Sequence, residues 1–241
     1  MTKCSFAELS DRGLIKIAGS DAHKLLQDIV TNDITLARDG HAVHAALLTP
    51  QGKILFDFFL MDKGDVLLME CDKESTTELI KRLTFYKLRA DVTFEDISAN
   101  HSVWAAWGDC SLSDGGDTAY ADPRHPELGL RLILDAGATP EIDGTQSAMA
   151  DYHAHRIGLG IPEGGKDYPF GNTFPHEADY DLLKGVDFKK GCYVGQEVVS
   201  RMQHRGTARK RIVPVSGVTG VSSGAEITAG DSSIGSLGSV A

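Results

Sequence analysis

The chain has 241 residues, of which 41% are hydrophobic and 24% charged, the composition of a soluble globular protein with one large or two medium domains. Its formal net charge of −10 disfavours direct binding of nucleic acid through phosphate neutralisation. No apolar run approaches the roughly 20 residues of a membrane-spanning helix, so no membrane association is predicted.

The first hundred residues are expected to form a meander of strands with two helices. Ser20 or Asp21 is a suitable cap for the first helix, and the turns at 49–52 and 62–65 contain the Gly, Pro and Asp residues that separate strands. The expected elements are strands at 14–17, 42–49, 54–61, 65–70 and 91–97, and helices at 20–30 and 73–85.

One carboxylate interrupts the strand expected at 54–61. Asp57 is the only charged residue in that run, and a continuous apolar run is typical of a strand buried on both faces. A buried carboxylate must be paired, hydrogen-bonded or neutral, which makes Asp57 a candidate functional residue. The alternative is a strand-end acid that binds backbone amides or Lys53.

A second round of strands and a helix follows the first. Two successive strand–helix rounds favour an α+β body over a parallel βαβ sheet. His153 and His155 lie two residues apart, on different faces of the expected helix, and none of the nine histidines forms a ligand pair with an acid, so no metal site within this chain alone is predicted. The expected elements are strands at 102–107, 117–121 and 129–135, and a helix from 145 to about 157.

Two later stretches lack a long periodic pattern. Residues 158–188 are irregular and rich in Gly, Pro, Asp and aromatic residues, and a segment of this length inside a compact protein is usually functional. It is expected to wrap the same cavity as the motif that follows it. After Arg211 the pattern changes to short strands separated by Gly and Ser turns.

A glycine-flanked cysteine forms the most informative motif, Lys-Lys-Gly-Cys-Tyr-Val-Gly-Gln-Glu at residues 189–197. A thiolate is the nucleophilic and metal-binding form of cysteine, and nearby cations or a helix N-terminus favour it. A helix is expected from Gln196 to about Arg205, with Gly206 as its stop. Cys192 is therefore a candidate functional thiol; the alternative is a small buried side chain in a tight turn.

The charge distribution also singles out this motif. Residues 184–211 contain eight Lys or Arg and two acids, so this window carries +6 in a chain of net charge −10. A basic region in an acidic protein would attract an anionic ligand or an acidic partner. The alternative is a solvated charged surface.

The four cysteines give no local pairing pattern. Cys4, Cys71, Cys110 and Cys192 lie far apart, which excludes a local zinc ribbon or a Cys-x-x-Cys redox pair. With no secretion signal in the sequence, four reduced thiols are predicted. The expected location is the cytoplasm, or the mitochondrial matrix if the source is a eukaryote.

The motif and the blocks before it resemble the YgfZ family. Those are folate-binding proteins of the aminomethyltransferase (glycine-cleavage T-protein) superfamily, linked to iron–sulphur cluster maturation and tRNA modification. The resemblance implies a duplicated α+β folate-binding body with antiparallel sheets at 1–205, in two intertwined halves of roughly 1–100 and 101–205, and a truncated C-terminal β-barrel at 206–241. The similar blocks are 14–22, 26–34, 50–57, 156–162, 174–177, 189–201 and 234–239.

The resemblance also implies roles for particular residues. Asp57 matches the acid that contacts the folate and its reacting nitrogen, although Phe56 replaces a second acid and Gly158 replaces a pterin-binding Glu. Tyr152 is predicted to stack on the pterin, or else to be a core tyrosine. Arg201 would hold a folate carboxylate or pair with Glu197. The implied cofactor contacts are Asp57, Tyr152, Lys190, Gly191, Tyr193, Gly195, Gln196, Glu197 and Arg201, with catalytic roles for Cys192 and Asp57.

The function that the resemblance implies is a tetrahydrofolate-binding factor for assembly or repair of iron–sulphur clusters, with Cys192 as its thiol. A cluster usually takes four protein ligands, so Cys192 would hold one only together with cysteines of a scaffold or client protein. The alternative is a folate-dependent one-carbon transferase that uses Asp57. A protein acting directly on tRNA is disfavoured by the net charge.

Overall fold

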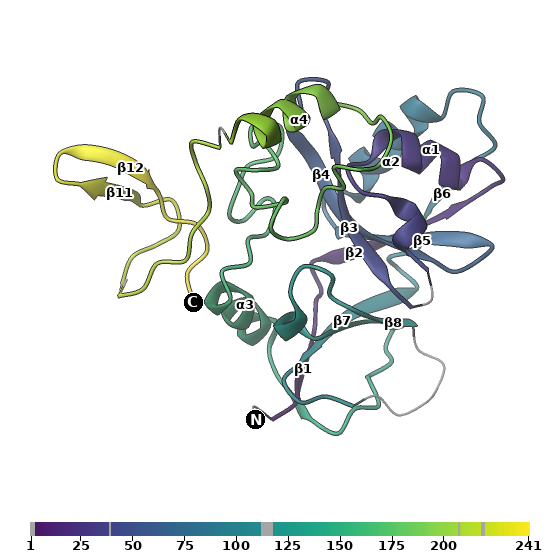
Figure 1. The fold of residues 1–241 in the computed structure, drawn as a ribbon. Coiled ribbons are helices and arrows are strands. Elements are labelled where there is room, and N and C mark those ends of the chain that lie inside the picture. Colours follow the sequence, from purple (N-terminus) through teal and green to yellow (C-terminus); the bar gives the residue numbers. More distant parts are fainter. Residues whose placement is uncertain (1–2, 39, 112–117, 207, 218–219) are drawn as a thin grey trace.

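Two five-stranded sheets form most of the structure, a computed structural model that describes residues 3–38, 40–111, 118–206, 208–217 and 220–241 (Figure 1). The first sheet has the strand order β3-β4-β5-β2-β6 and is antiparallel throughout. The strands predicted for the first hundred residues are confirmed. They are β2 (Arg12–Ala18), β3 (Ala42–Leu48), β4 (Ile54–Asp62), β5 (Val66–Asp72) and β6 (Thr93–Asp96).

Two helices, α1 (Ala22–Ile29) and α2 (Thr76–Lys87), cover one face of this sheet (Figure 1). Leu26 of α1 and Leu83 of α2 are fully buried in a core that also contains Phe58 of β4. Burial of each such side chain contributes about 1.5–3 kcal/mol relative to its exposure. The apolar side of α1, with Leu25, Leu26 and Ile29, therefore faces the sheet.

Two helices begin three or four residues later than predicted, because side chains bind the backbone just before them. The carboxylate of Asp72 accepts hydrogen bonds from the backbone N and the hydroxyl of Ser75, so α2 begins three residues late. The carboxylate of Asp151 accepts from the backbone N of Ala148, so α3 (Met149–Gly158) begins four residues late. Capping preferences of this kind extend over only a few residues and do not fix a helix start precisely.

The second sheet takes its strands from distant parts of the chain, in the order β10-β1-β7-β9-β8. Strand β1, which was not predicted, pairs antiparallel with β7 and parallel with the short β10. The N-terminal segment thus belongs to the second sheet, whereas the division into two intertwined halves stays a prediction. The strands are β1 (Ser5–Glu8), β7 (His101–Trp107), β8 (Thr118–Ala121), β9 (Leu130–Asp135) and β10 (Thr145–Gln146); residue 117, also predicted as strand, lies outside the described residues.

A second core lies between the two five-stranded sheets and joins them. It contains Leu14 and Phe59 from the first sheet, Ala105 and Ile133 from the second, and Tyr152 from α3. The 3₁₀ turn η2 (Pro126–Leu128) contributes Leu128 to this core, whereas η1 (Ile34–Leu36) contributes Ile34 to the core of the first sheet. The body is therefore a two-sheet α+β structure, whereas internal duplication stays a prediction.

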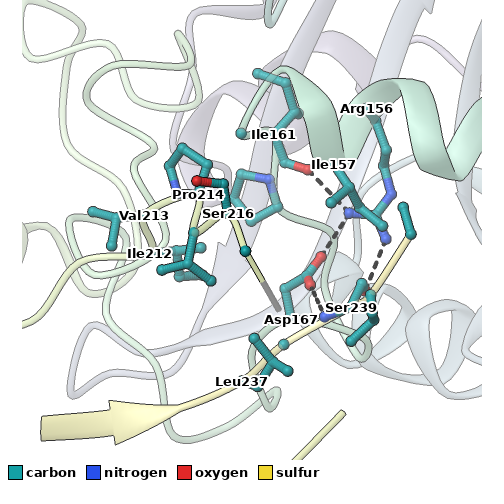
Figure 2. A pocket seen from close by; sticks show the side chains of 17 residues that line it. Arg156, Ile157, Ile161, Asp167, Ile212, Val213, Pro214, Ser216, Leu237 and Ser239 are labelled. Carbon is teal, nitrogen blue, oxygen red and sulfur yellow. Dashed lines mark hydrogen bonds and ion pairs between the residues drawn. The ribbon is translucent and has the colours of Figure 1, made fainter. Parts of the chain in front are cut away.

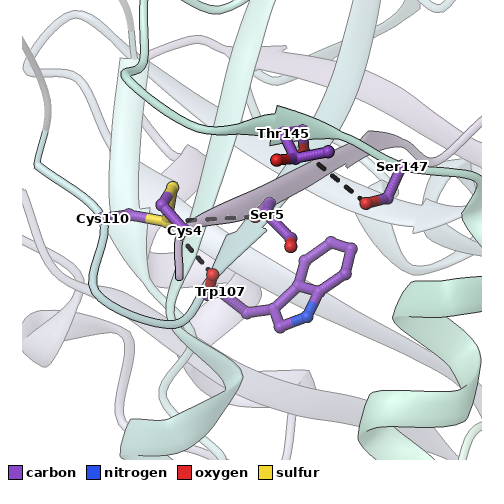
Figure 3. Close-up of a disulfide and its surroundings, with 6 residues drawn as sticks. All are labelled: Cys4, Ser5, Trp107, Cys110, Thr145 and Ser147. Carbon is purple, nitrogen blue, oxygen red and sulfur yellow. Dashed lines mark hydrogen bonds between the residues drawn. A yellow bond between two sulfur atoms is a disulfide. The ribbon is translucent and has the colours of Figure 1, made fainter. Parts of the chain in front are cut away.

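The prediction of four reduced thiols is wrong for two of them, because a disulfide joins Cys4 and Cys110 (Figure 3). Ser5 of β1 is paired with Trp107 of β7, so the residues just beyond these strand ends come together. A separation of 106 residues hides this pair from any local spacing rule. The free cysteines are Cys71 and Cys192.

Residues 159–195, between α3 and α4, form no helix or strand, and we call them the irregular segment. They include nearly all of the stretch predicted to be irregular, 158–188, and pack over one end of β3 and β4. Tyr180 and Tyr193 of this segment are buried against Leu48 and Ile54 in a third core. Helix α4 (Gln196–Arg205) follows, and it ends at Gly206 in the left-handed conformation, as predicted.

The C-terminal residues form a hairpin that projects from the body (Figure 1). Strands β11 (Glu226–Ala229) and β12 (Ser232–Ser236) pair with each other and, in the described part of the chain, with no other strand. The chain then returns to the body, where Ser239 binds Arg156 and Asp167 (Figure 2). This hairpin does not test the prediction of a partial barrel at 206–241.

Candidate functional site

Cys192 lies exposed on the loop that leads into α4. The other free cysteine, Cys71, is buried in β5, where burial raises its pKa to about 12. The structure thus leaves Cys192 as the thiol that a partner molecule can reach. The buried, structural alternative for Cys192 does not apply.

The loop approaches the turn between β3 and β4 very closely at one glycine. Gly195, the N-cap of α4, has φ +80°, and a Cβ atom there would lie 2.6 Å from the carbonyl oxygen of Thr49. Any other residue would be both strained and too large at this position. Gly195 therefore fixes where α4 begins on the body.

Lys190 is buried and turned toward the end of α1. Its ammonium donates hydrogen bonds to the carbonyl oxygens of Gln27, Val30 and Asn32 at 2.8, 2.6 and 2.8 Å. Burial lowers its pKa to about 8, against the attraction of nearby Asp33. Because these carbonyls use all three donors of the ammonium, Lys190 has none left for a ligand.

The remaining motif residues lie on and around the start of α4. Tyr193 is buried with the Lys190 ammonium 5.4 Å from its ring centre, and Gln196 donates to the carbonyl oxygen of Gly191 at 3.5 Å. Glu197 and Arg201 are exposed, and in the described part of the chain no ion pair joins them. The motif residues therefore share one region, but their cofactor contacts stay a prediction.

Asp57 lies on β4 beside a very small cavity. Its carboxylate accepts a hydrogen bond from the hydroxyl of Tyr168 at 2.8 Å. Burial raises the pKa of Asp57 above its usual value, against the attraction of Arg12. The cavity has a volume of about 10 Å³, room for about one water molecule. It is lined by Arg12, His44, Asp57, Phe58, Phe59, Arg124, Arg131 and Glu163.

A group of buried charges lies between the sheets, and we call it the central charge cluster: Arg12, Glu70, Asp122, Arg124 and Arg131. The carboxylate of Glu70 on β5 accepts from Arg12 of β2 at 2.9 Å and from Arg131 of β9 at 2.5 Å. Asp122 accepts from Arg124 at 2.7 Å and from Arg131 at 3.3 Å. The cluster therefore links the first sheet to the second, and no prediction from the sequence included it.

Tyrosines complete the hydrogen bonding of this cluster. Tyr120 donates to Glu70, and the hydroxyl of Tyr152 accepts from Arg131 at 2.8 Å. Tyr152 is 1% exposed, and its ring packs edge-on against Trp107. The structure thus places Tyr152 in the core, and its predicted stacking on a pterin stays untested.

A larger depression, which we call the Phe188 hollow, opens next to the small cavity. It has a volume of about 520 Å³, and His44 lines both spaces. Lys184, Phe188 and Lys189 of the irregular segment line it, together with Pro123, which follows β8 in the chain. Its lining residues are Asn32, Leu36, His41, Ala42, Val43, His44, Pro123, Asp181, Lys184, Val186, Asp187, Phe188 and Lys189.

Backbone strain marks the edge of this hollow. Lys184 has φ +54°, a conformation that costs a non-glycine residue about 1 kcal/mol or more. The amide of Asn32 donates to the carbonyl oxygen of Lys184 at 2.7 Å and holds the backbone there.

Among the described residues no group of three or more His, Cys, Asp or Glu is placed to hold a metal ion. No described helix is long and apolar enough to cross a membrane.

Comparison with known proteins defines the class of this chain. Residues 1–112 match the profile of the GCVT N-terminal domain family. The fold is similar to the glycine cleavage system aminomethyltransferase T of Bartonella henselae, with a TM-score of 0.65 and 15% identity over 84% of this chain and 64% of that chain. The match over residues 1–112 and the aminomethyltransferase-like fold confirm the predicted fold at this level.

Three relatives are more similar to this chain in sequence than that aminomethyltransferase is. Each is named as a mitochondrial iron-sulfur cluster assembly factor IBA57 homolog. The homolog of Mycosarcoma maydis is 35% identical over 227 residues, covering 87% of this chain and 56% of its own. Those of Neurospora crassa (32% over 234 residues, 88% and 53%) and Dictyostelium discoideum (31% over 249 residues, 86% and 61%) are comparable. The chain spans little more than half the length of these relatives.

Proposed function

We propose that this chain supports the assembly or repair of iron–sulphur clusters in client enzymes, and that Cys192 is its working thiol. The observation that carries the proposal is the exposure of Cys192 on a loop whose backbone is fixed by buried contacts at Lys190 and Gly195. Similarity to relatives named as cluster assembly factors supports the same role. A thiol that is both accessible and held in place suits transient binding of a metal cluster.

The cluster would be cargo shared with another protein. Iron–sulphur clusters are usually held by four protein ligands, and Cys192 offers one. The other ligands would come from a scaffold or client protein during a transient contact. A link to tRNA modification would then be indirect, through a client enzyme that needs a cluster. The YgfZ-type role and a location in the cytoplasm or the mitochondrial matrix belong to this proposal.

The chain also offers a place for a folate. The Phe188 hollow, at about 520 Å³, falls in the usual range for small-molecule sites, whereas the cavity at Asp57 is far too small for a pterin. Phe188 would stack on an aromatic ring, and Lys184 and Lys189 would bind carboxylates. When bound, a folate would supply a nitrogen that can carry one-carbon groups. Contact with Asp57 would require the small cavity to widen.

A one-carbon transferase that uses Asp57 remains the alternative proposal. The raised pKa of Asp57 and its bond to Tyr168 suit a proton-handling group. Against it, the cavity beside Asp57 is very small, Phe56 stands where a second acid is expected, and Gly158 has no side chain to bind a pterin. Formation of methylene-tetrahydrofolate from a methylamine substrate, lost in Asp57→Asn, would favour this alternative.

Replacement of Cys192 by Ala is expected to abolish maturation of cluster-dependent enzymes. The measurement is the activity of such enzymes in cells that lack this protein and are complemented with wild type or variant. Cys71→Ala is the matched control, because Cys71 is buried and should not contact a partner. Full activity with Cys192→Ala, at equal protein level, would rule out the thiol as the working group.

Replacement of Phe188 by Ala is expected to weaken tetrahydrofolate binding about fivefold to tenfold, because an exposed ring that stacks on the ligand is lost. Calorimetric titration of the purified protein measures this. Phe85→Ala removes an exposed phenylalanine from α2 and should leave affinity unchanged. If Asp57→Asn weakens binding and Phe188→Ala does not, the ligand lies at Asp57 instead of in the Phe188 hollow.

A further inference from the structure

We infer that Lys190 is a positioning residue that holds the Cys192 loop, residues 184–195, in the conformation that presents the thiol. The inference rests on the proposed role of Cys192. It departs from the predicted role of Lys190 as a cofactor contact. Its basis is a set of buried hydrogen bonds between this loop and the segment that follows α1.

The first part of that set is the Lys190 ammonium itself. The carbonyl oxygens of the last turn of a helix have no partner within the helix, and a lysine near a helix end can bind them. Lys190 binds the carbonyls of Gln27 and Val30 at the end of α1 and that of Asn32 just beyond it. One side chain therefore satisfies three backbone groups that lie about 160 residues earlier in the sequence.

Further hydrogen bonds run along the same contact. The backbone N of Asp187 donates to the carbonyl oxygen of Thr31 at 3.0 Å, and the hydroxyl of Thr31 donates to the carbonyl oxygen of Gly185 at 2.6 Å. The amide of Asn32 donates to the carbonyl oxygen of Lys184. The first half of the Cys192 loop therefore lies against residues 30–32 and is hydrogen-bonded to them.

The loop is also held within itself and at its far end. The carboxylate of Asp187 accepts from the backbone N of Lys189 at 2.6 Å and of Lys190 at 3.1 Å. Beyond the thiol, Gly195 contacts the turn at Thr49. Cys192 lies between these two fixed points, exposed while its neighbours Lys190 and Tyr193 are buried. Without the Lys190 contacts, the loop would be held on one side of Cys192 only, by the contact of Gly195 with Thr49.

The geometry also explains why lysine, and not arginine, is suited to this position. An ammonium is compact and directs three donors toward three converging carbonyls, whereas a guanidinium is planar and larger. Lys190→Arg is therefore expected to keep the positive charge but to lose the hydrogen bonds that hold the loop in place. Lys190→Met keeps a long apolar chain but leaves three carbonyls without their donor.

The test is hydrogen–deuterium exchange followed by mass spectrometry on the full chain. In Lys190→Met, amides in residues 184–190 are expected to exchange about tenfold to hundredfold faster, while those of β3 and β5 keep their protection. Lys24→Met is the matched control, since Lys24 lies exposed on α1 and pairs only with the exposed Asp28. Client maturation should fall in Lys190→Met and in Lys190→Arg but not in Lys24→Met.

The outcomes separate this inference from the proposed function. If Cys192→Ala supports maturation, the thiol proposal fails, whatever the exchange data show. If Cys192→Ala is inactive while Lys190→Met keeps both maturation and loop protection, the positioning role is overturned. Should Lys190→Met fail to fold, Lys190→Arg tests the same contact, because a guanidinium does not fit the three converging carbonyls; unchanged protection of residues 184–190 and unchanged maturation in that variant would also overturn the positioning role.

Discussion

Glu70→Gln is expected to lower the free energy of unfolding by about 3–5 kcal/mol, because it removes the shared partner of two buried arginines. Glu70 is fully buried, and its carboxylate binds Arg12 and Arg131 and accepts from Tyr120. The uncharged amide accepts fewer bonds and leaves excess positive charge between the sheets. The loss is large because these contacts join elements of both sheets.

Urea unfolding followed by circular dichroism at pH 7 measures this loss. The matched control is Glu78→Gln, which removes an exposed pair with Lys81 on α2 and should cost less than about 0.5 kcal/mol. A loss below about 1 kcal/mol for Glu70→Gln would show that the central charge cluster tolerates an unpaired arginine. The two arginines that bind Glu70 would then be neutralised by other groups, and Asp122 is the candidate for Arg131.

Much of the fold could be predicted because strands and helices leave local patterns. The strands of the first sheet were predicted within a few residues, since their apolar runs end at clear Gly, Pro and Asp turns. Strand β1 escaped prediction because it is four residues long and pairs with strands about 100 and 140 residues away. The Cys4–Cys110 disulfide escaped for the same reason, since it depends on that pairing.

The candidate site was only partly predictable, for a different physical reason. The rule that flagged Asp57, a charge inside an otherwise apolar strand, applies also to Glu70 in β5 and Arg131 in β9, since the other charge of each strand, an Asp, stands at its end. Consistent use of that rule would have found two members of the central charge cluster. The Phe188 hollow and the contacts of Lys190 carry no such signal, because segments distant in sequence form them only in the folded chain.

Acid is expected to destabilise the protein through His44 before the carboxylates take effect. His44 is 4% exposed, and its ring lies against those of Tyr180 and Phe59. Burial, reinforced by the positive charge of Arg124, lowers its pKa to about 3. Because the folded pKa lies below the usual value near 6.5, the unfolded chain takes up the proton first as pH falls. The stability is therefore complete above pH 6.5 and is lost progressively toward pH 3.

The difference between wild type and a His44 variant from pH 6.5 to 4.5 isolates this effect, because carboxylates with raised pKa values, such as Asp57, act on both proteins alike. Carboxylates with lowered pKa values, such as Glu163 at about 2, lose their contribution only below the unfolded value near 4.5. Across the two pH units above that limit, His44 should account for about 2–3 kcal/mol of lost stability. Urea titrations of wild type and His44→Gln at pH 6.5 and 4.5 measure it. The loss in the free energy of unfolding between the two pH values is expected to be smaller by that amount in the variant. Equal pH dependence of the two proteins would mean that His44 accepts a proton in the folded state, which its burial beside Arg124 makes unfavourable.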